Sequence, residues 1–252
     1  MARGVLGDLG FTQVSPIDPQ ASTWTPSGAG TVRSLELAHA DNPWSLDLHV
    51  SLDRTPFPGL TSTLGSPSSS EGEVWHEFTR PVRVLPQPLL LTYLALHASR
   101  HFYSITLVRL VEIALVARRD FADRPERWRA LDQLIRRTAT GRFVFPALGL
   151  AERLAPGSVD PLVLERAAAA APRRLRRLVH RTTPASAQRL HPHPLGTGLV
   201  FAASSREVIA ALLEAAWPRL DGKLMPLRQA LGVQWRRIRR GMFRMMPGKL
   251  LV

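Results

Sequence analysis

Residues 89–118 form a long, mostly apolar segment that follows two prolines, Pro86 and Pro88. Proline is favoured in the first turn of a helix, and the apolar spacing persists for several turns. We therefore predict a single helix from Leu89 to about Arg118. A helix that is apolar on most sides is usually buried, so this segment predicts a domain built around it.

The rest of the chain after this segment also has helical periodicity, interrupted at Thr140-Gly141, at 155–157 and at 191–194. The periodicity predicts helices at 125–139, 143–154, 160–170, 172–182, 205–217 and 224–241.

The residues before Pro86 have strand and loop signals. Trp44 to Leu52 alternates between apolar and polar residues, which predicts a strand with one apolar face. It forms a predicted hairpin with residues 32–40, across Asn42-Pro43. We also expect a short strand at 82–85, a helix end at Leu6–Phe11 with Gly10 as its cap, and loops at 13–33 and 54–72.

These patterns predict an α+β fold. A small mixed β-sheet that includes residues 44–52 would pack against the 89–118 helix, and a mostly α-helical C-terminal region would follow. We expect two domains, a β-containing one at 1–85 and an Arg-rich helical one at 86–252.

The composition excludes several classes of protein. Of the 252 residues, 45% are apolar, enough for a core, so a wholly disordered chain is excluded. The absence of cysteine excludes a disulfide scaffold, a cysteine-liganded zinc site and a thiol nucleophile. No apolar run approaches ~18–20 residues, and the first residues make a poor signal peptide, so we expect a cytoplasmic protein with no membrane partner.

The charge is unevenly distributed. Residues 1–125 hold 10 basic and 12 acidic residues, whereas residues 126–252 hold 23 basic and 8 acidic ones. A GC-rich genome would explain the preference for arginine over lysine but not this asymmetry. The basic half predicts a surface that attracts phosphates, nucleic acid or an acidic peptide.

Two arginine clusters carry much of this charge. They consist of Arg173, Arg174, Arg176 and Arg177, and of Arg236, Arg237, Arg239 and Arg240. Arginine suits bidentate contacts with phosphate, so nucleic acid is a candidate partner. A solvated helix face is the alternative interpretation.

Asp47 and His49 lie two residues apart in the predicted strand 44–52 and therefore point to the same side. A carboxylate held in a strand can ligate a divalent metal or accept a proton. A solvent-facing polar side of a hairpin is the alternative.

The predicted 89–118 helix carries one polar stripe about 120° wide, formed by His97, Arg100, His101, Ser104 and Glu112. The stripe is interpreted in three ways: a phosphate-binding cleft, a solvated surface, or a zinc site of His97 and His101 with Glu112 as a distant ligand. Arg109 lies outside the stripe and is a further candidate for substrate binding.

Motifs for other activities are missing. The sequence contains no Gly-x-Ser-x-Gly, no phosphate-binding Gly-rich loop and no Gly-x-Gly-x-x-Gly. A metalloprotease motif is also absent, because Ala98 follows His97.

The order of the remaining motifs is similar to that of an uncharacterised bacterial nucleotidyltransferase-like family of the polymerase-β superfamily. The resemblance covers roughly residues 4–190. It rests on Leu46-Asp47-Leu48-His49, on the helix Leu94-Ala95-Leu96-His97-Ala98-Ser99-Arg100-His101, on the stretch Leu107 to Ala114, and on Trp128.

The resemblance implies transfer of a nucleotidyl or related phosphoryl group from an NTP with Mg²⁺ as the cofactor. It implies that Asp47 is the catalytic and metal-ligating acid. His49, His97, Arg100, His101 and Arg109 would contact the NTP or an acidic or peptide acceptor. Members of the family also occur among natural-product tailoring genes, which makes a peptide acceptor a candidate.

The family's Gly-Ser turn and Asp-x-Asp pair have no match in this sequence. Leu6 to Phe11 resembles the helix end that follows them, so we expect the chain to start after the catalytic strand. Three explanations remain open: a longer natural protein, a strand supplied by another chain, or a relative that has lost catalysis and retains a binding role. The last is the alternative function, a module that binds a peptide, RNA or a protein through its basic half.

Overall fold

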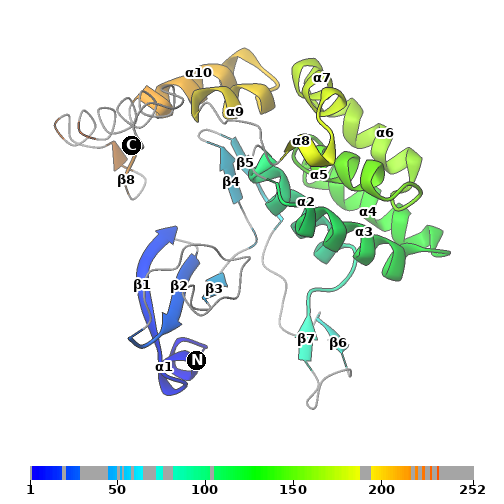
Figure 1. The fold of residues 1–252 in the computed structure, drawn as a ribbon. Helices are drawn as coiled ribbons and strands as arrows, with labels where there is room; N and C mark the ends of the chain where they lie inside the picture. Colours follow the sequence, from blue (N-terminus) through cyan, green and yellow to red (C-terminus); the bar gives the residue numbers. More distant parts are fainter. Residues whose placement is uncertain are drawn as a thin grey trace, which may run out of the picture. The chain divides into compact units, whose positions relative to one another are not determined.

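The computed structural model describes residues 2–18, 21–28, 45–49, 52, 54–57, 60–64, 72–75, 82–102, 105–187, 194–216, 219–220, 223–224, 228 and 232. The chain divides into two compact units, residues 1–53 and 54–252. This division lies upstream of the domain boundary that we predicted at residue 85. The described strands and helices together make an α+β protein that is mostly helical (Figure 1).

The first unit contains a short helix and a three-stranded antiparallel sheet. The helix is α1 (Ala2–Asp8), and the strands are β1 (Phe11–Asp18), β2 (Ala21–Pro26) and β3 (Leu46–His49), in the order β1-β2-β3. Gly10 has a φ of 81° just after α1, as its predicted capping role requires.

β1 and β2 correct our prediction of a loop at 13–33. Their prolines and serines suggested a loop, but Thr23, Trp24 and Thr25 are residue types that favour strands once neighbours pair with them. β2 is paired on both sides, and these three residues are buried. The pairing of β1 is irregular between Val14 and Asp18, a stretch that includes Pro16, where an amide donor is missing.

The predicted strand at 44–52 is observed at its centre, as β3. Its described partner is β2, which pairs Thr23 with Asp47 and Ala21 with His49. The expected partner strand, 32–40, lies outside the described residues.

The second unit begins with two short hairpins. β4 (Arg54–Phe57) pairs with β5 (Leu60–Ser62), and β6 (Glu73–Trp75) pairs with β7 (Val82–Val84), which confirms the strand expected at 82–85. All strand pairs among the described residues are antiparallel, so the mixed sheet that we expected is not found there.

The remaining elements of this unit are nearly all helices. They are α2 (Leu89–Arg100), α3 (Leu107–Phe121), α4 (Pro125–Arg137), α5 (Gly141–Leu154), α6 (Pro161–Ala169), α7 (Arg173–Arg181), α8 (Pro184–Ala187), α9 (Pro194–Phe201) and α10 (Ser205–Ala216), with the two-residue strands β8 (Arg219–Leu220) and β9 (Lys223–Leu224) near the end. Five helices therefore match predictions to within two residues. α8 and α9 were not predicted, and most of the expected helix 224–241 lies outside the described residues.

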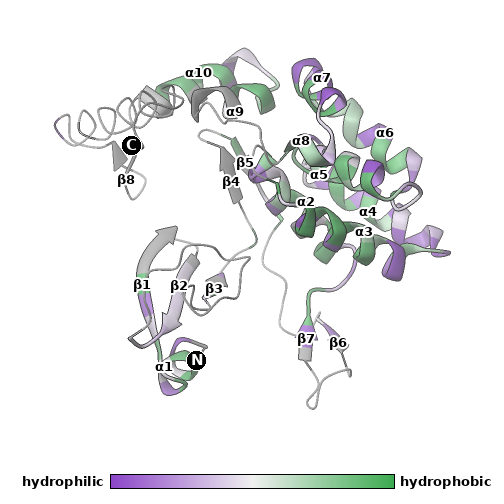
Figure 2. Cartoon of the chain, in the orientation of Figure 1, coloured by the Kyte–Doolittle hydropathy of each residue, from purple (hydrophilic) through white to green (hydrophobic). Residues whose placement is uncertain are grey.

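α5 is the central helix of this unit. Every residue from Phe143 to Ala151 is buried, and α5 packs against α2, α3, α6, α7 and α8. Figure 2 shows the corresponding contrast in hydropathy between the apolar α2 and the strongly polar ends of α7.

The single helix predicted at 89–118 is wrong. α2 ends at Arg100 and α3 begins at Leu107, and the turn between them buries Phe102 and Ile105. Thr106 occupies the N-cap of α3 in an extended conformation, and threonine at this position is a helix-start signal that the apolar periodicity concealed. Both α2 and α3 pack against α5.

Candidate functional site

The site residues predicted in the first unit lie on β3. Asp47 and His49 occupy alternate positions of this strand, opposite Thr23 and Ala21 of β2. Residues that face each other across paired strands share a face of the sheet, so threonine and alanine positions border the two polar ones. His49 is half-buried.

The register also identifies an acidic position that the sequence analysis missed. Asp18 of β1 pairs with Ala21, which pairs with His49, so two strand spacings, about 10 Å, separate Asp18 from His49. Asp18 was missed because its segment was interpreted as a loop. The other acids near Asp47 in sequence, Asp41 and Asp53, lie outside the described residues.

The Mg²⁺ implied by the resemblance fits these residues incompletely. Mg²⁺ requires near-octahedral oxygen coordination, with carboxylates close to one another. The described part of the sheet offers one acid at β3 and one two strands away. Across the described residues, no group of three or more His, Asp or Glu side chains could hold a metal ion. We therefore derive no reaction step through Mg²⁺.

The site residues predicted in the second unit gather near the end of α2. The rings of Tyr93, His97 and His101 follow one another along the helix, with centroids 6.1 and 5.4 Å apart. His97 and Arg100 are half-buried, and His101 is exposed at the C-cap. The cluster is an accessible donor surface of imidazole and guanidinium groups.

Glu112 does not belong to this cluster, which corrects the continuous stripe that we predicted. It lies on α3, where its carboxylate binds Arg109 at 2.8 Å. Ser104 lies outside the described residues. The zinc site of His97, His101 and Glu112 depended on one continuous helix, and the break after Arg100 removes its geometric basis.

The first arginine cluster lies on α7. Leu175 and Val179 are fully buried and anchor this helix, while Arg173, Arg174, Arg176 and Arg177 are exposed. Arg174 donates to the carbonyl oxygens of Val200 and Ala202 at the end of α9, so one of the four has a structural role. The second cluster, Arg236, Arg237, Arg239 and Arg240, lies outside the described residues.

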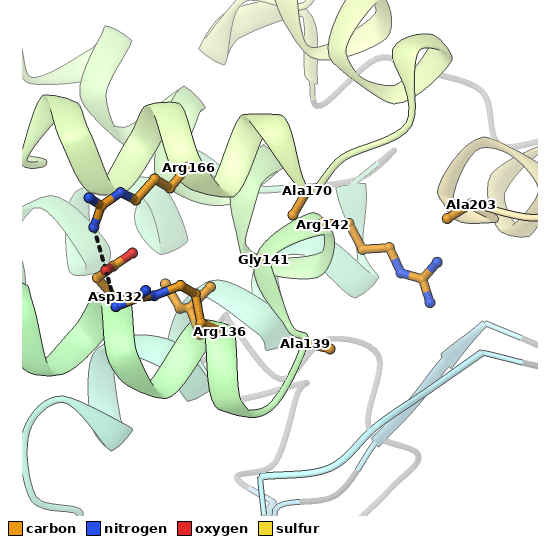
Figure 3. A pocket seen from close by; sticks show the side chains of 9 residues that line it. Asp132, Arg136, Ala139, Gly141, Arg142, Arg166, Ala170 and Ala203 are labelled. Carbon is orange, nitrogen blue, oxygen red and sulfur yellow. Dashed lines mark hydrogen bonds and ion pairs between the residues drawn. The ribbon is translucent and has the colours of Figure 1, made fainter.

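A cavity of about 360 Å³ opens among α4, α5 and α6 (Figure 3). Its charged lining residues are Asp132, Arg136, Arg142 and Arg166. The sequence analysis missed this group, because Asp132 and Arg166 are distant in the sequence and no motif connects them.

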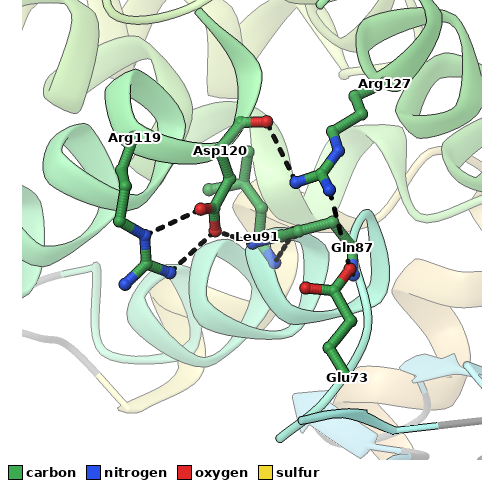
Figure 4. A network of polar contacts seen from close by, with 6 residues as sticks. All are labelled: Glu73, Gln87, Leu91, Arg119, Asp120 and Arg127. Atoms are coloured by element: carbon green, nitrogen blue, oxygen red, sulfur yellow. Dashed lines mark hydrogen bonds and ion pairs between the residues drawn. The ribbon is translucent and has the colours of Figure 1, made fainter. Parts of the chain in front are cut away.

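A second polar network, around Gln87, is structural (Figure 4). The Gln87 side chain donates to Asp120 at 2.7 Å and accepts from the backbone amide of Leu91 at 3.2 Å. The backbone amide of Gln87 donates to the Glu73 carboxylate. The hydrogen bond from Arg119 is the main reason that the pKa of Asp120 is below its usual value. This network connects the start of α2 to α3 and to β6. Its hydrogen bonds join parts of the protein to one another, so we interpret it as structural.

No described helix combines the length and the apolar character needed to cross a membrane. Comparison with known proteins gave no match to a family model, to a curated protein or to a solved structure.

Proposed function

We propose that this chain is a nucleotidyltransferase-like protein that binds a nucleoside triphosphate and transfers its nucleotidyl group to an acceptor, with a peptide as the candidate acceptor. The observation that carries the proposal is the position of Asp47 and His49 at alternate residues of β3, within an antiparallel sheet. This is the strand context that the Asp-Leu-His motif of the resembled family requires. In this proposal Asp47 would be a single carboxylate ligand to Mg²⁺ that the triphosphate itself carries, and His49 would contact the acceptor or substrate.

Within the second unit, His97, Arg100 and His101 form a separate proposed phosphate-binding group. Their accessibility at the end of α2 supports this role, since imidazole N–H and guanidinium groups donate hydrogen bonds to phosphate oxygens. Arg109 is not part of this group, because it lies on α3, where its guanidinium binds Glu112.

The test is calorimetric titration of the full chain with each NTP, with and without Mg²⁺. We expect Mg²⁺-dependent binding that Asp47→Ala abolishes. Asp8→Ala is the matched control, because Asp8 is an exposed acid of the same unit and lies at the end of α1. Absence of NTP binding by the unmodified chain would contradict the proposal.

The alternative function is a non-catalytic module that binds RNA, an acidic peptide or a protein partner. The exposed arginines of α7 favour it, because Arg173, Arg176 and Arg177 extend from a helix that is anchored by fully buried Leu175 and Val179. Such a surface neutralises phosphates without requiring a catalytic acid.

Fluorescence anisotropy with an RNA oligonucleotide and with an acidic peptide tests this alternative. RNA binding through phosphates should weaken steeply with salt. Replacement of Arg173, Arg176 and Arg177 by Gln should weaken it more than replacement of Arg118, Arg129 and Arg137, which are equally charged, exposed residues of α3 and α4. Equal effects of the two triple variants would exclude α7 as the binding surface.

A further inference from the structure

The cavity among α4, α5 and α6 has an unusual arrangement of charge. Asp132 is nearly buried, with 6% of its side chain exposed, and one of its carboxylate oxygens, Oδ2, receives both Arg166 at 2.6 Å and Arg136 at 3.0 Å. Figure 3 shows the two guanidinium groups approaching this carboxylate from α6 and α4. Two cations are therefore held beside a single anion, which leaves one positive charge uncompensated within this triad.

The opposite side of the cavity is electrically balanced. Arg142 also lines the cavity, but its guanidinium makes two hydrogen bonds of 2.7 Å to Glu207. The excess positive charge is thus concentrated at Arg136 and Arg166.

The two arginines remain accessible to a solute. The exposed fractions of their side chains are 62% for Arg136 and 48% for Arg166. Each guanidinium has five N–H donors, and its contact with Oδ2 of Asp132 uses only part of this capacity. The small residues Ala139, Gly141 and Ala170 form much of the remaining wall.

We propose that this cavity binds a small phosphorylated ligand, with Arg136 and Arg166 as the phosphate-binding residues and Asp132 as the anion that competes with the phosphate for their N–H donors. Two guanidinium groups side by side suit a tetrahedral oxyanion with several acceptor oxygens better than a planar carboxylate with two. The cavity's volume of about 360 Å³ lies within the range of small-molecule sites. The inference does not rest on nucleotidyl transfer, because its residues are distinct from Asp47 and from the α2 cluster.

The test is a calorimetric titration of the full chain with pyrophosphate in metal-free buffer. Inorganic phosphate and citrate serve as parallel probes. We expect pyrophosphate to bind more tightly than phosphate, citrate to bind least, and all binding to weaken as salt rises. Citrate binding as tight as that of pyrophosphate would overturn the assignment to phosphate.

Charge-neutral variants locate the site. Arg136→Gln and Arg166→Gln should each raise the Kd for pyrophosphate about tenfold, the size expected for one charge-assisted contact. Arg137→Gln is the matched control: it removes the same charge from the neighbouring, exposed position of α4 outside the cavity, and should change the Kd less than about twofold. Equal weakening by Arg136→Gln and Arg137→Gln would overturn the site.

Asp132→Asn gives a prediction of opposite sign, since it removes the competing carboxylate and should tighten pyrophosphate binding. A purely structural ion network would show no binding in any variant, which would overturn the proposal. Circular dichroism should establish that each variant is folded. If Asp132→Asn does not fold, Arg136→Gln, at an exposed side chain, still tests whether the cavity binds pyrophosphate. The NTP experiment depends on Mg²⁺ and is tested at Asp47, whereas this one is free of metal and is tested at Arg136 and Arg166, so failure of one is distinguishable from failure of the other.

Discussion

Arg142 at the start of α5 and Glu207 on α10 are joined by two hydrogen bonds of 2.7 Å, although 65 residues separate them. Only 14% of the Arg142 side chain and 26% of the Glu207 side chain are exposed. Next to this pair, the rings of Phe143 and Phe201 stack with centroids 6.0 Å apart. The ion pair and the stacked rings together hold α9 and α10 against α5.

The Arg142–Glu207 pair makes part of the protein's stability dependent on pH. The hydrogen bond from Arg142 is the main reason that the pKa of Glu207 is lowered from its usual 4.5. A carboxyl with a depressed folded-state pKa stabilises the fold above its unfolded-state pKa, and this contribution is lost as the pH falls through the folded-state value. We expect Glu207→Gln to lower the free energy of unfolding by roughly 1–2 kcal/mol at pH 7.

Urea unfolding at pH 7 and at pH 3 measures this contribution. The difference between Glu207→Gln and the unmodified chain should be smaller at pH 3 than at pH 7, because pH 3 lies below the unfolded-state pKa and part of the contribution is lost there. Glu165→Gln, an exposed change on α6, should cost little at either pH. A difference that is constant between the two pH values would show that the pair does not titrate as described.

Ala139 occupies a backbone conformation that suits glycine. It follows α4 with a φ of 51°, and the amide of Thr140 donates to the carbonyl of Ile135 while that of Ala139 donates to Arg136. This is a Schellman helix end, in which glycine avoids the strain of a Cβ atom. Ala139→Gly should raise the free energy of unfolding by about 0.5–1 kcal/mol. This is a net value, because glycine also makes the unfolded chain more flexible and so offsets part of the gain.

Asp123 is the natural comparison for Ala139, since it follows α3 with a φ of 56°. Aspartate tolerates this conformation better than alanine, so Asp123→Gly should gain less. Thermal and urea unfolding of both variants would check the order. A larger gain at Asp123 would contradict the strain argument.

Gly141 allows close contact between α5 and α6. A Cβ atom at this position would lie 2.9 Å from the Cβ of Ala170, whereas one at Gly149 would meet its nearest neighbour, Val179, at 3.5 Å. We expect Gly141→Ala to destabilise the protein by about 1–3 kcal/mol, as overpacking does, and Gly149→Ala to be tolerated.

A double-mutant cycle tests the contact directly. Ala170→Gly removes the opposing Cβ and should recover part of the stability lost in Gly141→Ala. Additive costs of the two changes in urea unfolding would show that the contact is not the source of the loss.

Arg153 joins the end of α7 to α5. Its Nη1 donates to the carbonyl oxygens of Val179 and His180, at 2.7 and 3.3 Å, and to that of Thr182. Because the variant would remove three hydrogen bonds to backbone carbonyls, Arg153→Ala should cost about 1–2 kcal/mol of unfolding free energy. Arg153→Lys should recover part of it, and Arg129→Ala, at an exposed position of α4, should cost less. Urea unfolding of the three variants provides the comparison.

The helices at 125–137, 161–169 and 173–181 were predictable from local signals. Each has buried residues at helical spacing, such as Leu175 and Val179 in α7, and two of them start at a proline, Pro125 or Pro161. The strand at Asp47 was predictable for a similar reason, because its alternation is contained within the strand itself. These signals depend only on neighbouring residues in the chain.

The break after Arg100 and the strands β1 and β2 were not predictable in this way. Phe102 and Ile105 are apolar and buried like the helical residues around them, so the apolar periodicity does not mark them as the residues between two helices. β2 contains threonine and proline, which also occur in loops, and becomes a strand because β1 and β3 supply its hydrogen bonds.

The candidate sites also differ in whether local sequence patterns or contacts between helices determine them. The sequence by itself determined the helical, arginine-rich character of the second half and the shared face of Asp47 and His49, because helical and strand periodicities are local. Only the tertiary structure decided that Glu112 binds Arg109 on α3 and that Arg136 and Arg166 meet at one oxygen of Asp132. The contact between Arg166 and Asp132 depends on how separate helices pack. Contacts within one helix have a fixed sequence spacing, whereas contacts between helices do not, so the sequence does not predict them.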